Sequence, residues 1–96
     1  MHDLTAFAVD CLAALAALDD DEPCGRDIIR WLNDELPHYD SINHGRLYPN
    51  LDKLEQDGFI RKEAMKHNRR SNVYRLTDDG WDELDARNDL LSEVLQ

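Results

Sequence analysis

Cysteine, long apolar runs and targeting signals are scarce or absent in this chain of 96 residues. Its two cysteines, Cys11 and Cys24, cannot form the disulfide scaffold that stabilises many small secreted domains. No stretch of about 18 apolar residues occurs, which argues against a transmembrane helix. The N-terminal sequence MHDLTAF lacks the basic region of a signal peptide. The sequence therefore predicts a soluble, cytoplasmic protein with no membrane partner.

Sequence patterns of metal sites and catalytic centres are absent too. The four histidines are scattered, and neither a His-x₃-His nor a Cys-x₂-Cys pair occurs. No motif brings a nucleophile, a base and an orienting group together, and no glycine-rich phosphate loop is present. We therefore expect no enzyme, no metal and no cofactor. Cys11 is expected in the core, whereas Cys24 precedes a predicted helix, where thiols are often reactive, so redox sensing stays open.

Positive charge is scarce and unevenly placed. Eleven Lys and Arg stand against 21 Asp and Glu, a net charge of −10, which by itself argues against a nucleic-acid partner. Residues 44–75, however, hold eight of the bases and only four of the acids, a net charge of +4, which leaves −14 for the remainder. The protein is thus an acidic body with one basic segment, and this segment is where DNA could bind.

The acidic composition favours Asp over Glu, and Arg outnumbers Lys by eight to three. This bias is the one we expect of a halophilic protein that works in molar salt. At about 1 M salt the Debye length is about 3 Å, so the acidic body would no longer repel DNA at a distance. The same salt removes much of the counterion release that drives ordinary DNA binding. Salt cations held between acidic side chains and phosphates are therefore possible partners at the interface.

Apolar residues recur at helical spacing in three segments of the chain. The pattern predicts helices over 4–18, 25–36 and 43–58, with Asn43 as the N-cap of the third and Gly58 as its stop. The acidic residues 19–22 suit the N-terminus of the second helix. Pro49 falls early in the third helix, where a tight or 3₁₀-like start would accommodate it.

The apolar period changes after Gly58. Segments 59–66 and 72–77 are predicted strands of a β-hairpin, and Thr77 is the predicted N-cap of a last helix that continues to the C-terminus. The order helix, helix, helix, hairpin, helix predicts an α+β, mainly helical fold, the winged helix-turn-helix. We expect a single domain, 1–96, with a DNA-binding core over 1–76, a wing over 59–76 and a C-terminal dimerisation helix over 77–96.

The third predicted helix would be the recognition helix, whose N-terminal side chains contact base edges in the major groove. Arg46 can make a bidentate contact with guanine, assisted by His44 and Asn43. Tyr48, Lys53 and Asn50 would position the helix on phosphates, and Gly45 lets the backbone approach closely. Alternatively, Arg46 and Lys53 are ordinary solvated charges. The candidate DNA-binding residues here are Asn43, His44, Gly45, Arg46, Tyr48, Pro49, Asn50 and Lys53.

Basic residues also cluster at the tip of the predicted hairpin. Lys66, His67, Arg69 and Arg70 stand there in a chain that is otherwise short of positive charge. A basic wing can lie along the DNA backbone or enter the minor groove, although a solvated loop is the simpler alternative. Two separate basic elements that one duplex could contact together favour DNA binding.

Two runs of sequence resemble the PadR family of transcriptional regulators, and most closely the short haloarchaeal PadR-like repressors. These runs are INHGRLYPNLDKLEQDGFIRKE over 42–63 and NVYRLTDDGWDEL over 72–84. The resemblance implies a homodimeric DNA-binding repressor whose C-terminal helix makes the dimer. Larger members carry a longer helical C-terminal domain that this chain lacks, so effector binding is not carried over. The matching positions are Gly45, Leu47, Tyr48, Pro49, Leu51, Leu54, Glu55, Gly58, Tyr74, Leu76, Thr77 and Gly80.

The last helix carries a short apolar seam with heptad-like spacing. A domain of this size buries only about 60–65 % of its unfolded surface, so pairing two subunits along this seam would stabilise both. Asn88 could fix the register, and Trp31 could join the interface or lie exposed. Alternatively, the seam packs on the first helix of its own subunit. The candidate dimer residues are Trp81, Leu84, Asn88, Leu91, Val94 and Leu95.

The sequence as a whole predicts a sequence-specific transcriptional regulator, a repressor that binds double-stranded DNA as a homodimer. Two recognition helices about 34 Å apart would contact successive major grooves of a pseudo-palindromic operator. Two alternatives come from other classes of protein. One is a winged-helix protein-interaction module whose acidic surface binds a basic partner. The other is a regulator gated by a small molecule near Trp31 or Trp81, or by oxidation of a cysteine.

Overall fold

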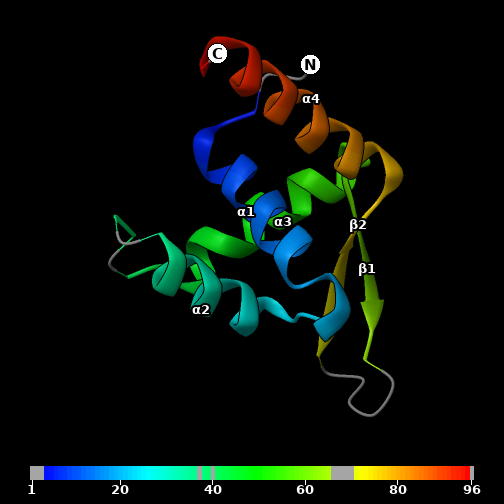
Figure 1. The fold of residues 1–96 in the computed structure, drawn as a ribbon. Coiled ribbons are helices and arrows are strands. Elements are labelled where there is room, and N and C mark those ends of the chain that lie inside the picture. The colour runs from blue at the N-terminus through cyan, green and yellow to red at the C-terminus, as the bar shows by residue number, and fades with distance from the viewer. Residues whose placement is uncertain (1–3, 37, 40, 66–70, 96) are drawn as a thin grey trace.

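The computed structural model describes residues 4–36, 38–39, 41–65 and 71–95, and the side chains of these as far as Asn88. The elements are α1 (Ala6–Ala17), the 3₁₀ turn η1 (Asp19–Asp21), α2 (Gly25–Glu35), α3 (His44–Gln56), β1 (Ile60–Ala64), β2 (Asn72–Leu76) and α4 (Asp78–Leu95) (Figure 1). The predicted order of three helices, hairpin and final helix is confirmed. No helix in the described part of the chain is long and apolar enough to span a membrane.

The first two helices begin at side-chain caps. The hydroxyl of Thr5 accepts a hydrogen bond from the Ala8 N–H at 3.1 Å, so α1 starts two residues later than predicted. The carboxylate of Asp27 accepts the Cys24 N–H at 3.0 Å and caps α2. The acidic residues Asp19–Asp21 form the separate turn η1 ahead of α2, which begins at Gly25 as predicted. The chain then reverses through Glu22 at φ +49° before the buried Pro23 leads into α2.

Helix α3 has the ends that its sequence predicts. The side-chain oxygen of Asn43 accepts the Arg46 N–H at 2.9 Å, and Gly58 ends the helix with φ +85°. The expected 3₁₀-like start is not observed, because α3 is α-helical from His44 to Gln56. Pro49 is tolerated because its missing N–H would bond only to the carbonyl of Gly45, an exposed residue in the first turn.

The wing is an antiparallel pair, β1 and β2, shorter at most ends than the predicted strands. Lys62 lies opposite Tyr74, and Arg61 lies opposite Arg75, so the two pairs point to opposite faces of the hairpin. The outer edge of β2 is partly covered, because the Tyr74 N–H donates to the Pro23 carbonyl at 2.9 Å. The hairpin is therefore held against the chain segment that leads into α2.

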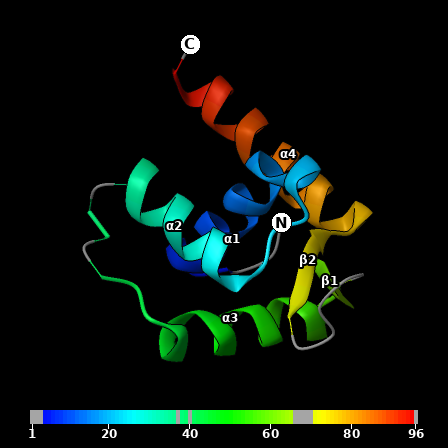
Figure 2. The same cartoon turned by 90° about the horizontal axis from the view of Figure 1, so that it is seen from below.

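The core lies between α1, α2, α3 and the hairpin. Helix α4 is capped by Thr77, whose hydroxyl accepts the Gly80 N–H at 3.2 Å and donates to the Gly58 carbonyl at 2.6 Å. Figure 2 shows α3 along one side of the molecule and α4 projecting from the opposite side. The largest fully buried apolar side chains are Leu12, Leu15, Ile28, Leu32, Leu47, Leu51, Leu54 and Ile60.

Candidate nucleic-acid interface

The outer ridge of α3 is formed by small and acidic residues, with the basic Arg46 and Lys53 along one side of it. Leu47, Leu51 and Leu54 are fully buried, and the helical period places Gly45, Pro49 and Asp52 on the opposite side, where all three are exposed. A Cβ on Gly45 would make one contact, a tight one of 3.3 Å with the Asn43 side-chain oxygen. The ridge is therefore low and narrow, which suits close approach to a flat or grooved ligand.

One flank of α3 faces α2 and the wing across a hollow of about 560 Å³. Arg26 from the first turn of α2, His44 from α3 and Lys62 from β1 all line this hollow. Two of these bases, Arg26 and Lys62, are not among the residues predicted from the sequence. Basic side chains beside a helix N-terminus form a favourable environment for phosphate. Asp52 lies at the same hollow and adds one acidic group.

Tyr48 forms the wall of this hollow rather than a free contact residue. It is half-buried, its ring stacks on His44 with a centroid distance of 5.4 Å, and it lies 6.5 Å from the ring of Tyr74. A Cβ on Gly25 would overlap the Tyr48 ring and hydroxyl, so the glycine lets α2 approach α3. Burial, followed by the nearby Tyr48, raises the pKa of Tyr74 to about 12, so this phenol stays neutral. The hollow is therefore walled by closely packed rings.

The other flank of α3 faces α1. The guanidinium carbon of Arg46 lies 4.2 Å from the centre of the Phe7 ring and 5.2 Å from that of Tyr39. Arg46 itself is exposed, as expected for a ligand-binding residue, but it stands on a flank rather than on the outer ridge. Asn50 donates its side-chain amide to the Arg46 carbonyl at 2.9 Å, and it lines a second hollow of about 250 Å³ together with Lys53.

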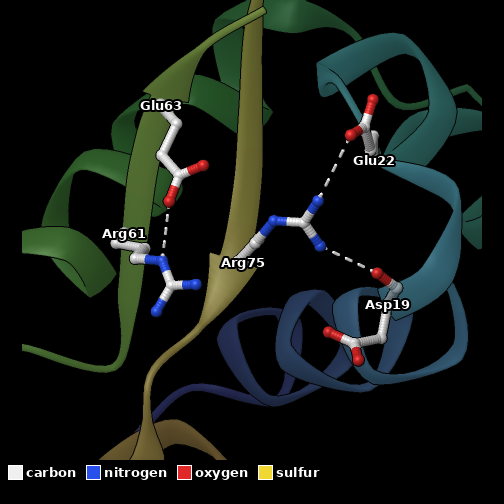
Figure 3. Close-up of polar contacts among 5 residues, drawn as sticks. All are labelled: Asp19, Glu22, Arg61, Glu63 and Arg75. Carbon is white, nitrogen blue, oxygen red and sulfur yellow. Dashed lines mark hydrogen bonds and ion pairs between the residues drawn. The ribbon is translucent and has the colours of Figure 1, made fainter.

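Two arginines of the wing are occupied within the protein (Figure 3). Arg75 points toward η1, where it donates to the Asp19 carbonyl at 2.9 Å and lies 3.8 Å from the Glu22 carboxylate. Arg61 donates to Glu63 at 2.9 Å on the same strand. The net charge of +4 counted along residues 44–75 thus overstates the positive charge that faces a ligand.

The predicted basic tip of the wing lies outside the described residues, so Lys66, His67, Arg69 and Arg70 remain predictions. The dimer candidates on α4 are described in part. Trp81 is 37 % exposed and Asn88 is exposed, whereas Leu84 is half-buried against the core of its own subunit. The side chains of Leu91, Val94 and Leu95 also lie outside the described residues.

The two cysteines differ as the sequence predicts. Cys11 is fully buried, and burial, with a smaller effect of the Asp10 charge, raises the pKa of its thiol to about 12. The prediction that Cys11 is a core residue is confirmed. The half-buried Cys24 donates its thiol to Asp27 at 3.4 Å. Among the described residues, no group of three His, Cys, Asp or Glu side chains is placed to hold a metal ion.

A helix-turn-helix formed by α2 and α3, with a two-stranded wing beside α3, defines a winged-helix protein of the type that binds DNA. The profile of the transcriptional regulator PadR-like family matches residues 14–86, most of the chain. The chain therefore belongs to this family of transcriptional regulators, which agrees with the expectation that it is not an enzyme.

Two solved structures and one characterised relative give the likeness in detail. RosR of H. salinarum is 36 % identical, with a TM-score of 0.78 over 96 % of this chain and 78 % of that one. Bacillus subtilis PadR in complex with operator DNA is 30 % identical, with a TM-score of 0.68 over 85 % of this chain and 46 % of that one. The negative transcriptional regulator PadR of B. subtilis (strain 168) is 36 % identical over 74 residues, 75 % of this chain and 41 % of its own length. The chain thus spans less than half of that relative.

Proposed function

We propose that this protein is a sequence-specific repressor that binds a pseudo-palindromic operator as a homodimer through α3. The observation that carries the proposal is the gathering of Arg26, His44 and Lys62 from three elements around one flank of α3. A positive face built jointly by the helix-turn-helix and the wing favours DNA over the alternative of a protein-interaction module, for which dispersed bases are expected. The likeness to PadR in complex with operator DNA supports the same proposal.

In this arrangement α3 enters the major groove with its low ridge of Gly45 and Pro49 foremost. Arg46 contacts bases from the α1 side, and Asn43 and His44 do so from the helix tip. The hollow between α3 and the wing receives a backbone phosphate. The other candidate residues position the protein on the DNA backbone: Tyr48, Asn50, Lys53, Lys66, His67, Arg69 and Arg70.

The dimer forms through α4, on the side opposite α3 (Figure 2). Trp81 is the one exposed large apolar side chain among those described, and it lies on this helix. Pairing through α4 leaves both copies of α3 free to contact the same face of one duplex. Asp52, which lines the phosphate hollow, offers a place for a salt cation between its carboxylate and the DNA.

Arg46→Ala and Lys62→Ala should weaken DNA binding in different ways. Loss of a base contact at Arg46 should cost about 1–3 kcal/mol and relax the sequence preference, whereas loss of a phosphate contact at Lys62 should weaken all sequences alike and lower the salt slope by about one. Fluorescence anisotropy on a fragment selected by the wild-type protein from random DNA, and on its single-base variants, measures both effects.

Arg61→Gln is the matched control, because Arg61 lies on the opposite face of β1 and is paired with Glu63. It should leave both affinity and sequence preference close to wild type. Unchanged binding of the selected fragment by both Arg46→Ala and Lys62→Ala would show that this face does not bind DNA.

Salt should stabilise the fold itself. The Debye length shortens from about 10 Å at about 0.1 M salt to about 3 Å at about 1 M, so repulsion within the acidic remainder of net charge −14 is screened. We expect the melting temperature to rise steadily with KCl and to rise much less with sucrose, which does not screen charge. Greatest stability in dilute buffer would contradict the halophilic interpretation.

A further inference from the structure

Arg46 lies against a small group of side chains that the sequence does not connect to it. Phe7 comes from α1, and Tyr39 comes from the segment between α2 and α3. Their rings meet edge to face, with centroids 5.6 Å apart and an interplanar angle of 80°. Asp10, one turn beyond Phe7 in α1, accepts a hydrogen bond from the Tyr39 hydroxyl at 2.6 Å. We call Phe7, Asp10 and Tyr39 the aromatic corner.

The aromatic corner is held rigidly. Phe7 is buried in the main core at 7 % exposure, and the Tyr39 N–H donates to the Leu36 carbonyl at 3.0 Å. Burial first, and then the hydrogen bond to Asp10, raises the pKa of Tyr39 to about 12. The phenol therefore keeps its proton throughout the physiological range and remains a donor to Asp10. The Phe7 ring is fixed by its packing in the core, and the Tyr39 ring is fixed by its hydrogen bonds to Asp10 and, through its backbone, to Leu36.

Arg46 uses only part of its binding capacity in this position. Its guanidinium carbon lies over the Phe7 ring at 4.2 Å, and in the described part of the chain the guanidinium has no hydrogen-bond or ion-pair partner. A contact of this kind uses the charge of the guanidinium and does not consume its five N–H donors, which remain able to bind acceptors. Its backbone is held as well, because Asn43 accepts the Arg46 N–H and Asn50 donates to the Arg46 carbonyl.

We infer that the aromatic corner fixes the direction in which Arg46 presents its donors, and that Phe7 and Tyr39 thereby determine operator specificity without touching DNA. They are positioning residues, and the inference rests on the proposed function. An arginine that is already oriented loses less side-chain entropy when it binds DNA. This smaller entropy cost favours only those sequences that place a pair of base acceptors where the oriented guanidinium can reach them. The aromatic corner should therefore favour the operator over other sequences, rather than favour DNA in general.

Two substitutions test this inference. Phe7→Leu removes the ring under Arg46 and keeps an apolar side chain, while Tyr39→Phe keeps the ring and removes only the hydrogen bond to Asp10. The ratio of affinities for the selected operator and for its single-base variants should fall about 3- to 30-fold with Phe7→Leu, the range of a cation–π contact, and by less with Tyr39→Phe. Affinity for unrelated DNA should change little.

Repeating both substitutions in an Arg46→Ala background separates positioning from a general structural role. Without Arg46, neither Phe7→Leu nor Tyr39→Phe should reduce the ratio further. An unchanged ratio in the single variants, or an equal fall in the Arg46→Ala background, would overturn the inference while leaving the proposed function intact. A wild-type protein that does not discriminate between DNA sequences at all would overturn the proposed function and this inference together.

Discussion

Replacing Gly80 by alanine should lower the free energy of unfolding by about 3 kcal/mol, the upper part of the range for overpacking. Gly80 is buried in the first turn of α4, and a Cβ there would overlap the carbonyl oxygen of Phe59 and press on the Leu76 side chain. That oxygen cannot move aside easily, because it accepts the Thr77 N–H at 3.0 Å. The overlap would therefore push α4 away from the start of the wing.

Urea denaturation of wild type and Gly80→Ala measures this effect, and Gly45→Ala is the matched control. Gly45 also lies in a helix, but a Cβ there meets only the Asn43 oxygen at 3.3 Å. Alanine at this position should change stability by no more than about 1 kcal/mol, because its better helix propensity is opposed by the tight contact with the Asn43 oxygen. Ordinary surface substitutions change the free energy of unfolding by up to about 0.5 kcal/mol. If Gly80→Ala lowered it by no more than that, α4 would not be held closely against the wing.

Trp81→Glu should convert the proposed dimer into a monomer and reduce operator affinity by about 100-fold or more. Trp81 is 37 % exposed in the single subunit, so a glutamate there can turn its carboxylate toward water in the monomer but would be buried in the dimer. The large effect on DNA follows from linkage, since two half-sites held by one dimer bind far more tightly than two separate subunits. Analytical ultracentrifugation and anisotropy on full and half operators measure the two consequences.

Ala86→Glu is the control for Trp81→Glu. It adds the same charge to the same helix at an exposed position, and the helical period places it well away from Trp81 and Asn88. It should leave the dimer and operator binding unchanged. A Trp81→Glu protein that remains dimeric, with full operator affinity, would remove α4 from the proposed interface.

Local features of the fold could be predicted from the sequence because they depend on neighbouring residues. Asn43 and Thr77 accept backbone N–H groups three residues ahead, and Gly58 takes the positive φ that ends α3. The errors are local as well: α1 begins two residues later than predicted, and α3 lacks the expected 3₁₀-like start.

The candidate site was predictable only in part, because surface charges acquire their partners through tertiary structure. Arg75 belongs to the basic segment along the chain, yet its charge is directed at the acidic turn 56 residues earlier. Arg26 belongs to the acidic remainder, yet it lines the same hollow as Lys62. A count of charge along the sequence therefore predicts that a basic region exists without identifying which bases face a ligand.

By itself, the sequence determined the order of the elements, the ends of α3, the scarcity of positive charge and the resemblance to a family of regulators. The order of the elements, the ends of α3 and the family resemblance depend on residues that are close together in the sequence, and the scarcity of positive charge is a matter of composition. Folding changes neither the local spacing nor the composition. Only the tertiary structure decided that Arg46 lies over Phe7 and Tyr39, and that Arg75 faces η1. Those contacts join residues far apart in the chain, so their geometry arises only when α1, α3 and the wing pack around one core.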